Sequence, residues 1–80
     1  MHYSYILKSL KDGRYYYGST VDVEKRLQKH NSGQVRSTKA RTPFEIHFIE
    51  KHENRSLAFQ REMFYKSIEG YKYLKENKII

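Results

Sequence analysis

The sequence predicts an α+β fold: a small three-stranded sheet flanked by helices, in the order β-β-α-β-α-α. Three observations predict it. Two Tyr-rich, β-patterned runs flank an Asp12-Gly13 turn, another β-patterned run follows Pro43, and helical patterns follow the second and third runs. Eighty residues are enough for one domain with a small core, so we expect residues 1–80 to form a single domain.

Residues 2–8 and 14–19 are expected to form a β-hairpin. Asp-Gly is a strong signal for a two-residue turn, because both central positions of a type I′ turn need a positive φ. With this turn, Lys11 faces Arg14 and paired residue numbers sum to 25. Odd residues of the first strand then share a face with even residues of the second. The shared face carries Tyr3, Tyr5, Leu7, Tyr16 and Gly18.

The first helix is expected to begin after Thr20, whose hydroxyl can cap it, and to end near Asn31. Ser32 and Gly33 then provide an ordinary helix exit. Arg26 and His30 are spaced i, i+4, which places them one turn apart on the helix surface.

The remaining segments are a basic loop, a strand and two helices. Residues 33–43 contain Arg and Lys but no acid, and we expect a surface loop there. Strand alternation over residues 44–52 places Phe44, Ile46 and Phe48 on one face. Helices are predicted over residues 55–67, capped by Asn54 or Ser56, and over residues 71–80, with Gly70 as the break between them.

The charge favours an anionic partner. Sixteen Lys and Arg residues against nine Asp and Glu give a net charge of +7, which favours nucleic acid over an acidic membrane surface. A basic surface that only confers solubility is the alternative. The chain has no cysteine, which excludes a disulfide framework and a thiolate metal site. No apolar run is long enough to span a bilayer and the N-terminus lacks signal-peptide features, so we expect a cytoplasmic protein.

Two tyrosine motifs lie in the predicted hairpin. Tyr3-Ser4-Tyr5 is followed by Tyr16-Tyr17-Gly18, with eleven residues from Tyr5 to Tyr16. Arg26 comes ten residues after Tyr16 and His30 four residues later, and Glu62 lies in the second predicted helix. This set resembles the GIY-YIG nuclease superfamily over nearly the whole chain. It is closest to the small standalone bacterial members, which are similar to the N-terminal incision domain of the excision-repair C subunit.

The chain departs from the family motifs at several positions. Of Gly-Ile-Tyr only Tyr5 is present, and Tyr-Ile-Gly is represented by Tyr16 and Gly18. Ser19 stands where some members have a lysine.

The resemblance implies a Mg²⁺-dependent DNA endonuclease of low sequence specificity, acting in DNA repair or recombination. Glu62 would hold one Mg²⁺ or Mn²⁺ ion, and no organic cofactor is implied. Arg26 suits the charge of the phosphate, because its guanidinium stays protonated and offers a planar set of donors. Tyr5 and Tyr16 would handle the proton of the attacking water, without a choice of base between them, and His30 would relay a proton or orient a tyrosine.

Two further groups are expected to contact DNA. Gly18 lets the backbone pass close to the helix start, where free N–H groups favour an anion. Arg36, Lys39 and Arg41 are expected to hold the nucleic-acid backbone near the site.

Each assignment has a structural alternative. Clustered tyrosines are common as half-buried strand residues, and Glu62 can pair with Lys66 at i+4 on its own helix. His2, His47 and His52 are interpreted as bystanders. At the level of function, the alternatives are a non-catalytic nucleic-acid-binding module of the same fold and a structural or ribosome-associated basic protein. Convergence of Tyr5, Tyr16, Arg26, His30 and Glu62 on one concave surface would favour the nuclease.

Overall fold

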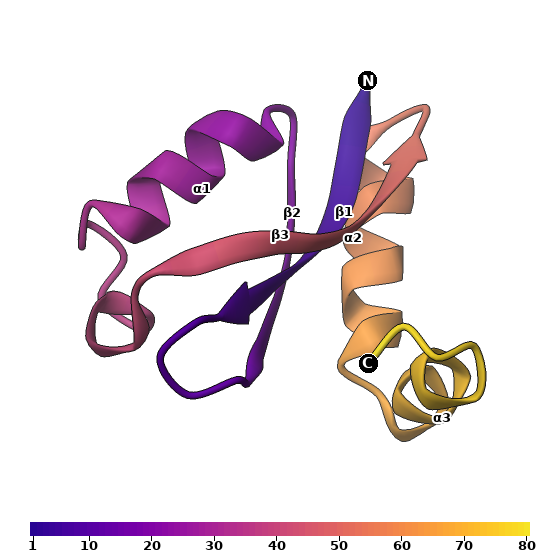
Figure 1. The fold of residues 1–80 in the computed structure, drawn as a ribbon. Coiled ribbons are helices and arrows are strands. Elements are labelled where there is room, and N and C mark those ends of the chain that lie inside the picture. Colours follow the sequence, from indigo (N-terminus) through magenta and orange to yellow (C-terminus); the bar gives the residue numbers. More distant parts are fainter.

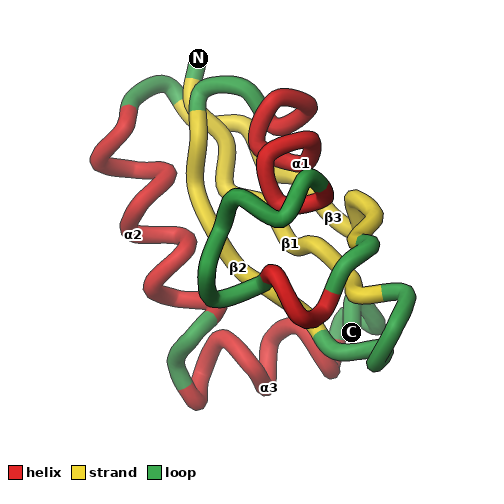
Figure 2. Tube along the Cα trace, turned by 90° about the vertical axis from the view of Figure 1, so that its left-hand side faces the viewer, coloured by secondary structure: helices red, strands yellow, loops and turns green.

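The computed structural model describes all of residues 1–80 and confirms the α+β fold and the predicted order of elements. Strand β1 (His2–Ser9) is the central strand of an antiparallel sheet, between β2 (Tyr15–Thr20) and β3 (Phe44–His52). The helices are α1 (Val23–Asn31), α2 (Arg55–Tyr65) and α3 (Ile68–Glu76), and a 3₁₀ turn occupies Lys39–Arg41. Figure 1 shows α1 on one face of the sheet and α2 on the other, and Figure 2 shows the strands between them.

The hairpin has a longer loop than the Asp-Gly signal predicts. Tyr5 pairs with Gly18 and Leu7 with Tyr16, so paired residue numbers sum to 23, and the two-residue turn is wrong. The Ser9 hydroxyl accepts hydrogen bonds from two backbone N–H groups of the loop, those of Lys11 and Asp12, both at 3.1 Å. These bonds stabilise the loop of residues 10–13. A shift of two keeps the side-chain parity, so the predicted shared face is confirmed.

The sheet carries one apolar cluster on each face. On the α1 face, Tyr5 and Leu7 of β1 pack with Val23 and Phe44. On the opposite face, Ile6 packs with Tyr65 of α2 and Leu74 of α3. The two faces of β1 are therefore both covered, which explains why four consecutive residues of this strand, 4–7, are buried.

A β-bulge in β3 divides its hydrophobic residues between the two faces. Leu7 pairs with Ile46 whereas Ile6 pairs with Phe48, which leaves His47 as an extra residue on β3. Ile46 packs in the α1 cluster and Phe48 in the opposite one. The prediction of Phe44, Ile46 and Phe48 on one face is thus wrong for Phe48, because strict alternation assumes no bulge.

Helix α1 begins later than its sequence pattern indicates. The cap is Asp22, whose carboxylate accepts from the backbone N–H of Lys25 at 3.0 Å. Thr20 is the last residue of β2, and its hydroxyl accepts from the N–H of Asp22 at 3.3 Å. The prediction of Thr20 as the cap is wrong, because Asp22 satisfies the free N–H group instead.

The α2–α3 corner also differs from the prediction. Asn54 caps α2 as expected, but α2 ends at Tyr65 and Gly70 lies inside α3. Ser67 caps α3 and accepts from the N–H of Gly70 at 3.0 Å. A Cβ at position 70 would lie 1.6 Å from the carbonyl oxygen of Phe64, so glycine is present for close packing and not as a break. None of the helices has the length and apolar character needed to cross a bilayer.

Candidate active site

A cleft opens where β2 ends, between the start of α1 and the middle of α2. Its volume is about 460 Å³. Helices α1 and α2 cover opposite faces of the sheet, and their side chains meet here because β2 is an edge strand (Figures 1 and 2). The lining residues are His2, Ser19, Thr20, Val21, Arg26, Arg55, Ala58, Phe59 and Glu62.

Arg26 and Glu62 are the two predicted site residues that line the cleft itself. Arg26 is exposed in the first turn of α1. Glu62 has only 14% of its side chain exposed, and both of its carboxylate oxygens are engaged. Ser19 Oγ donates to Oε1 at 2.7 Å and Lys66 Nζ to Oε2 at 2.8 Å. The predicted i, i+4 pair of Glu62 with Lys66 is therefore confirmed, and Glu62 faces the cleft at the same time.

Tyr5 lies directly behind the cleft and is only 1% exposed. Its ring packs on Gly18 so closely that a Cβ at position 18 would lie 2.3 Å from the phenol oxygen. Burial raises the pKa of Tyr5, and the neighbouring Arg26 guanidinium opposes this rise without cancelling it. The Tyr5 hydroxyl therefore stays protonated at neutral pH, as a hydrogen-bond donor beside Arg26.

Tyr16 and His30 form a pair deeper on the α1 face. Their ring centroids are 4.8 Å apart in an edge-to-face arrangement. His30 is fully buried, and its Nδ1 lies 2.8 Å from the hydroxyl of Thr38. That hydroxyl donates to the carbonyl of Val35 at 3.3 Å, so it accepts from His30, and Nδ1 carries the proton.

The other ring nitrogen of His30, Nε2, has no hydrogen-bond partner. Burial lowers the pKa of His30, and the charges of Arg26 and Lys29 lower it further. His30 is therefore neutral at pH 7, with a free acceptor at Nε2.

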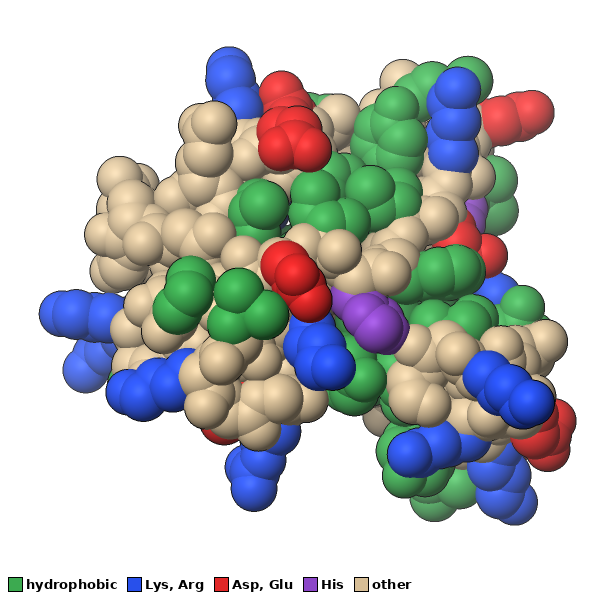
Figure 3. Space-filling model, viewed as in Figure 1, with side chains coloured by type: hydrophobic (Ala, Val, Ile, Leu, Met, Phe, Trp, Pro, Cys, Tyr) green, Lys and Arg blue, Asp and Glu red, His purple; other side chains and the backbone are tan.

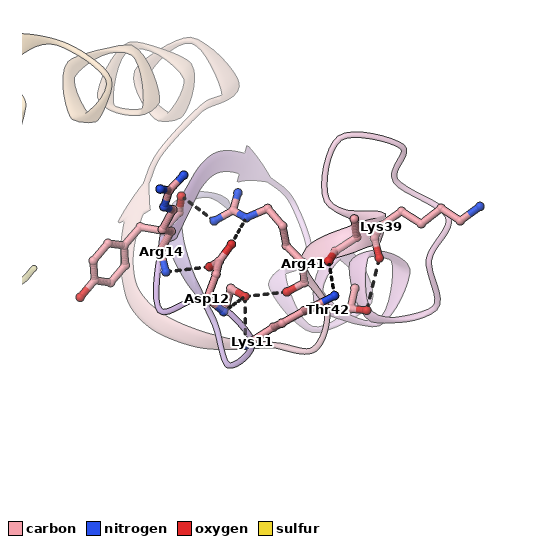
Figure 4. Close-up of polar contacts among 9 residues, drawn as sticks. Lys11, Asp12, Arg14, Lys39, Arg41 and Thr42 are labelled. Atoms are coloured by element: carbon pink, nitrogen blue, oxygen red, sulfur yellow. Dashed lines mark hydrogen bonds and ion pairs between the residues drawn. The ribbon is translucent and has the colours of Figure 1, made fainter.

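The basic loop lies at the other end of β2. Arg41 forms an ion pair with Asp12 of the hairpin loop, Nε to Oδ2 at 2.9 Å, and donates to the carbonyl of Tyr15 at 3.5 Å. The pKa of Asp12 is lowered to about 2, first by the backbone N–H of Arg14 and then by Arg41. Figure 4 shows both arginines beside Asp12, with Lys39 pointing away from them.

None of the three predicted cations of this loop lines the cleft. Tyr15 and Thr20 mark the two ends of β2, which are about 17 Å apart for an extended strand. Arg41 ties the loop to the hairpin, whereas Arg36 and Lys39 are exposed and form no ion pair.

Sequence reasoning missed several residues of this site. His2, interpreted as a bystander, lines the cleft, and Ser19 holds Glu62. Arg55 and Phe59 also line it, and their spacing to Glu62, i, i+4 and i+7, is a helical-face signal that could have identified them. Thr38 had no signal in the sequence, because its contact with His30 arises only when the loop folds back on α1.

The donor set around Glu62 suits one hard cation and no more. No group of three His, Cys, Asp or Glu side chains is close enough to form a complete metal site. Mg²⁺ is commonly held by one or two carboxylates, with water and substrate phosphate as the other ligands. A carboxylate next to a neutral hydroxyl, that of Ser19, at the wall of an open cleft fits this pattern.

Three comparisons with known proteins found similar sequences and a similar fold. Residues 1–76 match the family model of the GIY-YIG catalytic domain. A UPF0213 protein of Staphylococcus saprophyticus is 43% identical over 75 residues, which cover 92% of this chain and 90% of that protein. A UPF0213 protein of Bacillus cereus is 38% identical over 68 residues, covering 84% of this chain and 70% of that one. The solution NMR structure of a UPF0213 protein from Bacillus halodurans, 35% identical, has a TM-score of 0.55 and covers 96% of this chain and 84% of that one.

Proposed function

The chain belongs to the GIY-YIG family of catalytic domains, and we propose from this premise that residues 1–80 act as a single-domain, Mg²⁺- or Mn²⁺-dependent DNA endonuclease. One observation carries the proposal. Arg26 and Glu62 come from helices on opposite faces of the sheet, yet they line the same cleft, with the Tyr5 hydroxyl behind it. A purely structural basic protein has no need of this arrangement.

The scissile phosphate would lie in the cleft against Arg26. The guanidinium carries a permanent charge and can bind two phosphate oxygens at once. The Tyr5 hydroxyl is buried behind the guanidinium and can hold it in position through their hydrogen bond. Donors already in place where negative charge develops are the largest single source of catalysis in such reactions.

Tyr16 and His30 are our assignment for the proton of the attacking water. The buried Tyr5 is not available as a base at neutral pH, because its raised pKa keeps the phenol protonated. Tyr16 instead packs on a neutral histidine whose Nε2 has a free lone pair. Tyr16 would accept the proton of the attacking water while its own hydroxyl proton passes, directly or through a bridging water, to Nε2 of His30, which becomes an imidazolium.

Glu62 would hold a single ion, with Ser19 keeping the carboxylate in place. When bound, Mg²⁺ supplies positive charge that polarises the phosphate and offsets the charge of the transition state. Lys66 would have to leave Oε2 for that oxygen to become a ligand.

The partner is proposed to be DNA, recognised with little sequence preference. Figure 3 shows Lys and Arg side chains gathered over the end of α1 with its following loop, and again over α3. Arg36 and Lys39 are the proposed outer contacts of this surface. Such contacts position the phosphate backbone and carry no base information. A cytoplasmic role in DNA repair or recombination is consistent with such a substrate.

A plasmid-nicking assay tests the proposal. Supercoiled DNA should be converted to open circles with Mg²⁺ and not with EDTA. Arg26→Ala and Glu62→Gln should each reduce nicking by at least about 100-fold, because each removes charge stabilisation of the transition state. Arg14→Ala and Glu69→Gln are matched controls, since both side chains are exposed and lie outside the cleft. Nicking that survives in EDTA or in both cleft variants contradicts the proposal.

The alternative is a module of the same fold that binds nucleic acid without cutting it. The observation that favours it is that both oxygens of Glu62 already have partners. It predicts salt-sensitive binding to duplex, flap and single-stranded DNA with no cleavage of any of them under the same conditions.

A further inference from the structure

An exposed aromatic ring lies in the wall of the cleft. Phe59 is 53% exposed, although burial of a phenylalanine side chain ordinarily stabilises a protein. It lies on α2 one turn after Arg55 and one turn before Glu62. Val21, which is 62% exposed, adds a second apolar side chain to the lining.

Two concave surfaces meet at this ring. One is the cleft with Arg26 and Glu62. The other is a shallow depression of about 430 Å³ lined by Arg55, Ser56 and Phe59. Because Phe59 and Arg55 line both, a planar group can lie on the ring while a phosphate joined to it occupies the cleft.

The exposure of Phe59 differs from that of its apolar neighbours on α2. Leu57 and Met63 are 43% and 40% exposed, but neither lines the cleft. Leu57 faces a different depression, with His52 and Gln60. Phe59 is therefore the one Phe, Tyr or Trp side chain that lines the cleft beside Arg26 and Glu62.

We propose that Phe59 is a stacking platform for the base of an unpaired nucleotide next to the phosphate bound in the cleft. The inference rests on the proposed function and specifies its substrate: DNA with a single-stranded segment at the site, such as a flap, a gap or a frayed end. Both faces of a base inside a duplex are covered by its neighbours, so only an unpaired base can stack on the ring without a cost of unstacking. Arg55 contacts the flanking phosphate.

Measuring DNA binding in the presence of EDTA tests the stacking role of Phe59 separately from cleavage. The probes are a ten-nucleotide thymidine oligomer, a ten-unit oligomer of abasic sites with the same phosphates, and a blunt DNA hairpin. Phe59→Leu keeps an apolar side chain but removes the aromatic face, and should weaken thymidine-oligomer binding about tenfold. Hairpin binding should change less than twofold. The abasic oligomer should bind wild type as weakly as the thymidine oligomer binds Phe59→Leu.

A second variant gives a direct readout of stacking. The chain contains no tryptophan, so Phe59→Trp introduces a single fluorescent reporter. Its affinity for the thymidine oligomer should equal or exceed that of wild type, and the oligomer should quench its fluorescence whereas the hairpin should not. Leu57→Ala is the control for an exposed apolar residue of α2 outside the cleft, and should bind all probes as wild type does.

Two results would overturn the platform: unchanged oligomer binding in Phe59→Leu, or an equal loss on oligomer and hairpin. Failure of the nuclease proposal is a different result, the absence of Mg²⁺-dependent nicking. It leaves the binding comparison in EDTA unaffected.

Discussion

His30 combines complete burial with one satisfied and one free ring nitrogen. The satisfied nitrogen contacts Thr38, a residue that never touches the cleft. The proton position on the imidazole is thus fixed by a hydroxyl from the loop that follows α1. In many catalytic sites a hydrogen bond to one ring nitrogen of a histidine likewise sets which nitrogen carries the proton.

Replacing Thr38 by valine should remove the hydrogen bond that keeps the proton on Nδ1 of His30. The variant leaves Nδ1 unpaired in a buried place, which should cost about 1–3 kcal/mol of unfolding free energy. Imidazole ¹⁵N shifts should change from a pure Nδ1–H tautomer to a mixture. Thr38→Ser keeps the hydroxyl and should retain the wild-type ¹⁵N pattern. A valine variant with unchanged shifts would show that Thr38 does not set the tautomer.

Glu50 links stability to pH on the opposite face of the sheet. It accepts from Arg61 at 2.8 Å and from the Tyr65 hydroxyl, which in turn accepts from the buried Ser4 at 2.9 Å. Burial alone would raise the pKa of Glu50, but the hydrogen bonds from Arg61 and Tyr65 outweigh it and the pKa is lowered. The folded carboxyl therefore loses its proton more readily than the unfolded one.

The lowered pKa of Glu50 defines the pH range over which this residue stabilises the fold. The stabilising contribution is fully present above the unfolded pKa, near 4.3, and is lost as pH falls through the lower folded value. Glu50→Gln should reduce the unfolding free energy by about 1–2 kcal/mol at pH 7, and the difference should shrink at pH 3. Urea unfolding at the two pH values measures this. Glu69→Gln, on the exposed side of α3, should change stability little at either pH.

The elements are joined more tightly at the α2–α3 corner than the sequence indicates. Gly70→Ala would place a methyl group 1.6 Å from the Phe64 carbonyl oxygen, which is backbone and cannot rotate away. We expect a loss of about 3 kcal/mol or more, together with displacement of Leu74 from its cluster. Thermal unfolding and the Leu74 methyl resonances check this. Glu69→Ala in the same turn is the control, and equal stability of both variants would contradict the packing argument.

The existence and order of the elements could be predicted because the signals are local. A period of 2 residues predicted the strands and one of 3.6 residues the helices, and the odd–even face of the hairpin stayed correct despite a register error of two. The predictions were wrong where a residue distant in sequence, or a competing hydrogen-bond partner, determines the local structure. Ser9 Oγ stabilises a longer loop, Asp22 replaces Thr20 as the cap, and the bulge at His47 depends on pairing with β1.

At the scale of the whole molecule, the surplus of positive charge should dominate DNA binding. Affinity should fall linearly with salt on a log–log plot, with a slope set by the number of phosphates contacted. Arg36→Ala and Lys39→Ala should each reduce the slope by about 1 and leave the nicking rate at saturating protein unchanged. Arg41→Ala should instead destabilise the protein, because Arg41 holds Asp12 and the hairpin loop. Salt titrations of duplex binding distinguish these outcomes.

The site was less predictable than the fold. The motif spacing pointed to Tyr5, Tyr16, Arg26, His30 and Glu62. The structure places Arg26 and Glu62 in one cleft and packs Tyr16 against His30, whereas Tyr5 is buried against Gly18. Arg36, Lys39 and Arg41 were expected near these residues. They lie at the other end of β2, where Arg41 forms an ion pair with Asp12. Contacts between side chains far apart in sequence, such as Ser19 with Glu62, leave no trace in spacing.

The lysine one turn beyond Glu62 gives the protein an internal counter-ion. Its ammonium balances the charge of the carboxylate, which is only 14% exposed, so this wall of the cleft carries little net negative charge beside the Arg26 guanidinium. If the carboxylate binds a divalent ion as proposed, the displaced ammonium would stay within a side chain's length of the cleft and would be free to contact a phosphate. We therefore expect cation loading and DNA capture to reinforce each other through the swing of one flexible side chain.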